Sequence, residues 1–154
     1  MLSEPYLARL TADDIPDLEV LEGLTNLSFW GAENYRKFLE EAPEYFGIKA
    51  IVLGSRGRRE FAGFFLARAI VDNLEILKVG VAPSYQRQGI GSRLMESAYS
   101  EGMRRGCTRC FLEVRKSNRA ATEFYHRQYF RTVGTRQNYY RDPIEDAWVM
   151  ERRL

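Results

Sequence analysis

Residues 74–95 read LEILKVGVAPSYQRQGIGSRLM, and this stretch decides the fold of the chain. Its first eight residues alternate as in a β-strand, which places Ile76, Lys78 and Gly80 on one face. A loop with two glycines follows, and behind it apolar residues recur at helical spacing until Gly106. These apolar residues are Leu94, Met95, Ala98 and Met103. We therefore predict a strand, a glycine loop and a helix in direct succession.

The glycine loop, residues 86–91, is a candidate phosphate site. The N-terminus of a helix leaves backbone N–H groups unpaired and carries roughly half a positive charge, which favours an anion. Gly89 and Gly91 lack the Cβ atoms that would hold a phosphate away, and glycine permits backbone angles closed to other residues. A dinucleotide fingerprint would need glycine in place of Leu94, and the Gly-Lys-Ser/Thr of a Walker A loop is absent. From the residues alone, a phosphate site and an ordinary strand-to-helix turn both fit.

The segments on either side predict the other elements of a mixed α/β sheet. The predicted strands are Tyr6–Leu10, Phe46–Leu53, Glu60–Val71, Leu74–Val81, Cys110–Val114, Arg131–Gln137 and Ala147–Leu154. Besides the helix after the glycine loop, the predicted helices are one capped by Thr11–Asp14, one over Ala32–Glu41 and one capped by Ser117 or Asn118. A turn-rich stretch from Asn26 to Gly31 separates the first two helices, and Gly54–Gly57 is typical of a hairpin connection.

The composition bounds the class of protein. With 154 residues the chain fits one domain, residues 1–154, which can bury a core without disulfides or metal. It is 45% hydrophobic and 29% charged, which is typical of a globular protein and not of a disordered one. A net charge of +2 is too small to indicate a nucleic-acid surface. Neither a signal segment nor an apolar run of roughly 20 residues is visible, so we expect a cytoplasmic protein that binds neither membrane nor nucleic acid directly.

A C-x-x-C pair, Cys107 and Cys110, raises the question of a metal or redox site. The chain has no other cysteine, and His126 is its only histidine, so the four ligands of a structural zinc site are not available. A redox pair should open a helix after a strand, whereas this pair precedes or enters a predicted strand. We expect buried or half-buried thiols and no metal site.

The glycine loop and the strand before it carry a known signature. Gln86-x-x-Gly89-x-Gly91, placed after Val79-Gly-Val81, resembles the acetyl-CoA signature of the GNAT superfamily of N-acetyltransferases. Downstream segments are similar, in order and spacing, to the RimI group, which acetylates protein N-termini. These segments are Leu112-Glu-Val-Arg115, Ser117-Asn118, Phe124-Tyr125, Asn138-Tyr-Tyr140, Glu145-Asp-Ala147 and Met150. The N-terminal half matches more loosely. Lys78 stands at a strand position where that group often has Asn, and Tyr129 stands where a glycine usually follows the helix.

The resemblance implies a fold and a cofactor. The fold would be the GNAT fold, an α/β (α+β) architecture in which about four helices flank a mixed, mostly antiparallel central sheet of about seven strands. Backbone groups of Val79, Gly80 and Val81 would hold the pantetheine arm of acetyl-CoA and polarise its thioester. The residues that would cradle the pyrophosphate are Arg87, Gln88, Gly89, Ile90, Gly91 and Ser92. Asn118 would contact the cofactor farther along.

Acetyl transfer to an amine needs one group that removes a proton from the nucleophile and one that protonates the leaving thiolate. The resemblance places the general base at Glu113 and the acid at Tyr125. Glu75, on the preceding strand, is a competing base. Taken by themselves, Glu113 would be a solvated strand carboxylate and Tyr125 a core residue beside Phe124. The surrounding motif is what favours the catalytic roles.

The same resemblance places two aromatic loops beside the acceptor groove. Phe29 and Trp30 lie in the first loop, and Tyr139 and Tyr140 lie in the second. Glu75 could also contact the acceptor. For each aromatic residue taken singly, core packing is an equally good explanation.

The leading hypothesis is acetylation of a protein N-terminus, and the resemblance implies the N-terminal alanine of a small-subunit ribosomal protein. An α-amine has a pKa of about 7.7–8.0 against about 10.4 for lysine, so far more of it is neutral at pH 7 and one carboxylate suffices as base. The alternatives are acetylation of a lysine or a small-molecule amine, and a CoA-binding module without catalysis. Glu113 and Tyr125 argue against the last of these.

Overall fold

The computed structural model describes residues 4–25, 27–40 and 42–154, which form a seven-stranded sheet in the order β1-β2-β3-β4-β5-β7-β6. The strands are β1 (Tyr6–Arg9), β2 (Tyr45–Leu53), β3 (Arg59–Ile70), β4 (Asn73–Val81), β5 (Arg109–Arg115), β6 (Arg131–Tyr140) and β7 (Glu145–Arg153). Only β4 and β5 run parallel, and the other neighbours are antiparallel. The predicted mixed, mostly antiparallel sheet is confirmed.

Four α-helices flank this sheet within the described residues. They are α1 (Ile15–Leu24), α2 (Gly31–Glu40), α3 (Ile90–Arg104) and α4 (Arg119–Arg127), with short 3-10 turns at Ala12–Asp14 and Pro83–Tyr85. The Thr11 N–H donates to the Asp14 carboxylate and forms a capping box on the 3-10 turn that leads into α1, while α1 itself has no side-chain cap. The Ala121 N–H donates to the Asn118 side chain, which confirms the predicted cap of α4. The turn residue Asn26 and the expected helix end at Glu41 lie outside the described residues.

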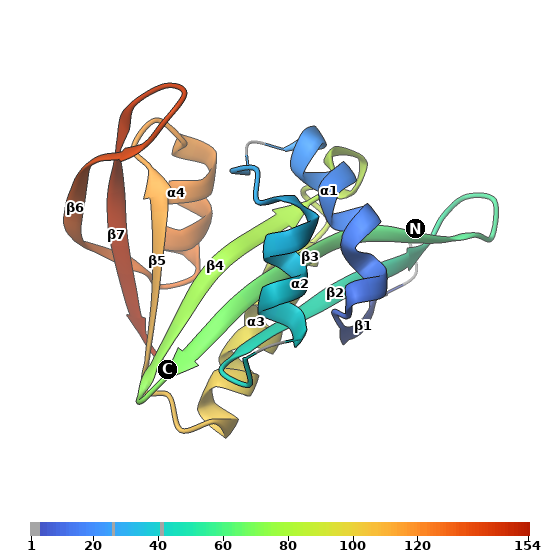
Figure 1. The fold of residues 1–154 in the computed structure, drawn as a ribbon, viewed down its shortest axis with the longest axis horizontal. Coiled ribbons are helices and arrows are strands. Elements are labelled where there is room, and N and C mark those ends of the chain that lie inside the picture. The colour runs from blue at the N-terminus through green and yellow to red at the C-terminus, as the bar shows by residue number, and fades with distance from the viewer. Residues whose placement is uncertain (1–3, 26, 41) are drawn as a thin grey trace.

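The helices lie on both faces of the sheet, as Figure 1 shows: α1 and α2 in front, α3 behind. The central strand β3 is therefore buried on both sides. Phe64, Phe65 and Leu66 are consecutive, point to alternating faces, and are all fully buried. Cys107 and Cys110 are both free and buried, as predicted. A hydrophobic core on each face thus holds the middle of the sheet in place.

One of the apolar residues at helical spacing on α3 does not face the core. Met103 is half exposed, while Gly102 beside it is buried. A Cβ atom on Gly102 would lie 2.8 Å from the Leu74 side chain, so the helix approaches β4 too closely there for a larger residue. The chain turns at Gly106, which has a positive φ of 87° as expected for a residue that ends a helix.

The parallel pair β4 and β5 is only partly joined. Residues 73–76 of β4 pair with residues 109–112 of β5, yet β4 continues to Val81 and β5 to Arg115. A register shift against β3 occurs between Leu66 and Ala67, opposite Leu77. Figure 1 shows the two strands diverging from their paired ends. Beyond Ile76, the side of β4 that faces β5 has no strand partner among the described residues.

Tyr129, just after the C-terminal end of α4, has an unusual backbone conformation. Tyr129 has a positive φ of 66° and its side chain is 83% exposed. The Tyr129 N–H donates to the backbone carbonyl of His126, and the Phe130 N–H donates to that of Tyr125. A residue in the left-handed conformation commonly terminates a helix in this way. Glycine is the usual choice at such a position because a Cβ atom is disfavoured there.

We predict that Tyr129→Gly stabilises the protein by about 1 kcal/mol, because it removes the strain of a side chain in the left-handed region. Chemical denaturation monitored by circular dichroism measures the change. Tyr129→Ala is the control, since it removes the same ring but keeps the Cβ atom. An equal gain from Tyr129→Ala would assign the effect to the ring and contradict the backbone explanation.

Candidate functional site

The glycine loop joins the open end of β4 to the start of α3. Gly89 has a positive φ of 82° and begins α3 without a side-chain cap. The first helical bond runs from the Arg93 N–H to the Gly89 carbonyl at 3.1 Å, so the preceding amides point out of the helix end. Gln86 donates to the Val81 carbonyl at 3.0 Å and ties the loop to the strand. The loop therefore presents free N–H groups at a positive helix terminus.

The structure explains only one of the two glycines of this loop by its backbone angle. Gly89 has a φ of 82°, and a Cβ atom on it would meet nothing within 4 Å, so this glycine is required for its backbone angle and not for close packing within the protein. A Cβ atom on Gly91 would lie 3.4 Å from the Phe124 ring on α4, an ordinary van der Waals distance, so packing within the protein does not require glycine there.

The loop and the open strand edge fit an elongated ligand that ends in a phosphate. The unpaired side of β4 beyond Ile76 offers backbone donors and acceptors to an amide-bearing arm. The start of α3, at the end of that edge, offers amides to an anion. A ligand with both parts would replace the strand partner that β4 lacks here.

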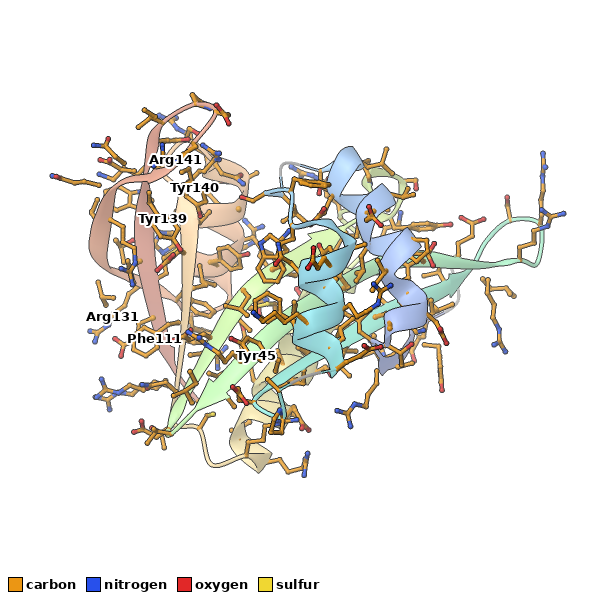
Figure 2. The ribbon with its side chains drawn as sticks, in the orientation of Figure 1. Tyr45, Phe111, Arg131, Tyr139, Tyr140 and Arg141 are labelled. Carbon is orange, nitrogen blue, oxygen red and sulfur yellow. The ribbon has the colours of Figure 1, made fainter. Side chains whose placement is uncertain are left out.

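The diverging strands β4 and β5 also border a cleft of about 710 Å³. It opens on the α1–α2 face, because Trp30 from the loop between these helices forms one wall. The lining residues are Trp30, Arg68, Asn73, Glu75, Ile76, Leu77, Phe111, Leu112, Glu113, Arg136, Tyr139, Tyr140 and Val149. Figure 2 labels Tyr139, Tyr140 and Phe111 on the β5–β7–β6 side of the molecule. The structure thus brings together Trp30, both tyrosines and both candidate bases.

Phe29 is the exception among the predicted acceptor residues. Its side chain is 79% exposed and does not line the cleft. Trp30 lines the cleft, while the residue before it lies on the outer surface. The prediction that Phe29 faces the acceptor groove finds no support in this geometry.

Each candidate base in the cleft is paired with an arginine. Glu75 forms an ion pair with Arg68, its cross-strand neighbour on β3, and Glu113 forms one with Arg136 on β6. The Glu113 side chain is 23% exposed and that of Glu75 is 36% exposed. The Glu113 carboxylate, together with burial, raises the pKa of Tyr139 to about 12. Glu113 is thus the more enclosed carboxylate and the one with a phenol beside it.

Tyr125 lies outside the cleft lining, on the α4 side of β5. It is buried, and its ring packs edge-on against Phe124 and Phe130 at 5.4 and 5.8 Å. Burial raises the pKa of its hydroxyl, and the neighbouring Tyr99 and Tyr140 add to the effect, so the phenol stays protonated at neutral pH. Burial and the charge of the Glu113 carboxylate raise the pKa of Tyr140 to about 12. Tyr140 is therefore close enough to interact electrostatically with both Tyr125 and Glu113.

The arginines of the cleft were missed by sequence reasoning. Arg68 lies opposite Glu75 because the turn between β3 and β4 occupies positions 71–72, whereas the predicted strands leave residues 72–73 between them and would pair Glu75 with Ile70. The partner of Arg136 could not be found by counting residues from a turn, because the register of β6 against β7 is irregular between Arg136 and Tyr140. The pairing of Arg136 with Glu113 depends on how β6, β7 and β5 lie together.

The remaining predicted residue, Asn118, caps α4. Its Oδ1 accepts the Ala121 N–H at 3.1 Å, which uses the carbonyl end of the amide and leaves the NH₂ end for another partner. Just before it, the Ser117 hydroxyl donates to Glu145 at 2.9 Å. Its contact with a cofactor stays a prediction.

Two searches of the described residues gave negative results. No group of three or more His, Cys, Asp or Glu side chains is arranged to hold a metal ion in 4–25, 27–40 and 42–154. Within the same ranges, no helix combines the length and the apolar character needed to cross a membrane.

Comparison with known proteins gives one family. A model described as the Acetyltransferase (GNAT) family matches residues 15–130. A ribosomal protein bS18-alanine N-acetyltransferase of Escherichia coli strain K12 is 38% identical over 93 residues, which make up 59% of this chain and 63% of that protein. The match therefore spans less than two thirds of that relative. The bS18-alanine N-acetyltransferase of Salmonella typhimurium strain LT2 is 29% identical over 143 residues, 92% of each chain.

Solved structures agree with this comparison. The crystal structure of the ribosomal-protein-S18-alanine N-acetyltransferase from Escherichia coli matches with a TM-score of 0.82 at 27% sequence identity. The match covers 97% of this chain and 94% of that one. The likeness extends over the strands β6 and β7, which lie beyond the segment matched by the family model.

Proposed function

This chain belongs to the GNAT family of acetyltransferases, and we propose that it transfers an acetyl group from acetyl-CoA to the N-terminal α-amine of a protein. The observation that carries the proposal is the split between β4 and β5. One end of this split meets the glycine loop, and its α1–α2 side opens into the cleft that holds Glu113. A cytoplasmic location remains a prediction from the sequence.

The residues of the split fit acetyl-CoA, which would supply the activated acetyl group as a thioester. The free edge of β4 at Val79, Gly80 and Val81 would bond the pantetheine amides and polarise the thioester carbonyl. The backbone amides from Arg87 to Ser92 would bind the pyrophosphate, with Gly89 holding the loop open. Asn118 would offer its free NH₂ group farther along.

We predict that Gly89→Val weakens acetyl-CoA binding, because valine cannot hold a φ of 82° without strain and the amides of the loop would turn away. Isothermal titration calorimetry measures the affinity. Gly57→Val is the matched control, because Gly57 has a φ of 70°, nothing within 4 Å of its Cβ position, and lies in the β2–β3 hairpin. Equal affinities of the two folded variants would contradict a role for the loop.

The chain's own groups suit the proton transfers of this reaction. Glu113, directly or through water, would accept a proton from the amine as its nitrogen bonds to the acetyl carbon. Tyr125, which burial keeps protonated, would donate its proton to the sulfur as the carbon–sulfur bond breaks. Arg136, bonded to Glu113, would have to release or share that carboxylate when the amine arrives. Glu75 is the alternative base and is similarly paired with Arg68.

We predict that Glu113→Gln lowers kcat by about 10²–10⁴-fold and leaves acetyl-CoA affinity within twofold, because the amide keeps the shape but cannot accept the proton. Glu75→Gln is tested in parallel, and Glu123→Gln, an exposed carboxylate on α4, is the control. Steady-state kinetics with a fixed peptide decide between them. Full turnover of folded Glu113→Gln with loss in Glu75→Gln would move the base to Glu75.

Tyr125→Phe is expected to lower kcat without lowering stability by more than about 1 kcal/mol, because none of the hydrogen bonds between described residues involves its hydroxyl. Tyr99→Phe, another buried tyrosine on the same side of the sheet, is the control. Stopped-flow measurement of thiol release gives the rate. Unchanged turnover in Tyr125→Phe would return this residue to a packing role.

The acceptor is the finer part of the proposal. Two observations support it. The relatives are named as alanine N-acetyltransferases of ribosomal protein bS18, and at pH 7 a larger fraction of an α-amine than of a lysine side chain is neutral. Trp30, Tyr139 and Tyr140 give the cleft aromatic walls suited to a short peptide end. The N-terminal alanine of a small-subunit ribosomal protein is therefore the acceptor that we propose.

We predict that a peptide with a free N-terminal alanine and blocked lysines is acetylated, and that the same sequence with a blocked N-terminus and free lysines is not. Mass spectrometry after incubation with acetyl-CoA identifies the modified position. Preferential labelling of the lysine peptide would overturn the N-terminal assignment and leave the acetyltransferase proposal in place.

A further inference from the structure

A buried ion pair lies behind the acceptor cleft, on the α1 side of β4. Lys78 and Glu22 are each only 5% exposed and form a direct ion pair. Tyr35 of α2 is completely buried, and its hydroxyl donates to Glu22 and lies 3.3 Å from the Lys78 ammonium. We call these three residues the buried cluster. Neither the acetyl transfer nor the cofactor site described above uses it.

The buried cluster bonds directly to the loop between α1 and α2. The Lys78 Nζ donates to the carbonyl of Ser28, and the Glu22 carboxylate accepts the Trp30 N–H at 3.2 Å. The ammonium also lies 4.6 Å from the centre of the Trp30 ring, at cation–π distance. Three contacts thus connect one buried charge pair to the two ends of a three-residue segment.

These contacts constrain the segment more strongly than ordinary packing would. Burial lowers the pKa of Lys78, and the Glu22 carboxylate opposes this effect, so the ammonium depends on its partners. Hydrogen bonds from an ionised group are shorter and stronger than neutral ones. A displaced segment would leave a charge and a carbonyl without partners inside the protein, which is costly. The position of Trp30 is therefore tied to the position of Lys78 on β4.

We propose that Lys78, with Glu22 and Tyr35, is a positioning residue that holds Trp30 as the wall of the acceptor cleft and thereby sets the affinity for the acceptor. Lys78 stands between Leu77, which lines the cleft, and Val79 on the free edge of β4. Strand β4 would in this way position both the wall of the acceptor cleft and the thioester of acetyl-CoA. The effect on affinity rests on the proposed function, whereas the effect on Trp30 does not.

The test uses Lys78→Met, which keeps the apolar stem and removes the charge. The chain has two tryptophans, so the measurement is made in a Trp148→Phe background, where fluorescence reports Trp30 alone. Acrylamide quenching of this fluorescence measures the accessibility of the Trp30 ring without any reaction. The same variants are then assayed for peptide KM, kcat and acetyl-CoA affinity.

Two further variants separate positioning from stability. Lys49→Met is the matched control, because Lys49 on β2 forms an ion pair at 2.5 Å with the buried Asp14, away from the cleft. The double variant Glu22→Gln/Lys78→Met removes the unpaired charge that the single variant leaves behind, so its stability should recover. The side-chain amide introduced by Glu22→Gln can still accept the Trp30 N–H, but no ammonium holds the Ser28 carbonyl.

The proposal requires Lys78→Met to raise the quenching constant of Trp30 and to raise the peptide KM about tenfold or more, with kcat and acetyl-CoA affinity within twofold. The double variant should keep the raised KM although it regains stability, and Lys49→Met should change neither readout. Unchanged quenching and KM in Lys78→Met, or a KM that returns to normal with stability, would overturn it. If the wild type acetylates no peptide, the proposed acceptor fails, and the quenching result alone decides whether Lys78 positions Trp30.

Discussion

Beyond Ile76, β4 and β5 share no strand pairing, and the rest of the site depends on this constraint. Strand β5 pairs with β7 along its whole length, while β4 stays paired with β3 up to Val81. Both antiparallel pairings are kept, so the single parallel pairing gives way. The divergence creates a free backbone edge on β4 that ends at the glycine loop. It also opens the cleft on the α1–α2 face, so cofactor and acceptor can meet at one gap.

The charges around this gap differ in what they contribute. The pairs Arg68–Glu75 and Arg136–Glu113 are partly exposed, and such pairs stabilise a protein by about 0–1 kcal/mol at most. They can therefore open at little cost when an amine enters the cleft. The pair Lys78–Glu22 is buried, where loss of one partner costs about 3–5 kcal/mol. The proposed chemistry thus involves the pairs that can rearrange, and the proposed support of the cleft wall involves the pair that cannot.

Family membership and acceptor choice rest on different parts of the chain. The family model matches residues 15–130 and so includes β4, the glycine loop, β5 and α4. Arg136, Tyr139 and Tyr140 lie beyond it on β6, and they line the cleft next to Glu113. Trp30 completes the opposite wall from a loop that the sequence matches loosely to related acetyltransferases. Residues of the proposed cofactor site are thus easier to infer from the family than residues of the proposed acceptor cleft.

The sequence by itself determined the elements of the fold and carried the signature of the family. Period-two and period-3.6 patterns act over a few neighbouring residues, which is why the strands, the helix after Gly89 and the cap at Asn118 could be predicted. The exposure of Phe29 and Met103 could not, because a local pattern does not say which side of a loop or helix end meets the sheet. Only the tertiary structure decided that Lys78 is buried against Glu22, 56 positions away. Contacts at that separation follow from how whole strands and helices pack, and no local pattern of residue types encodes their distance.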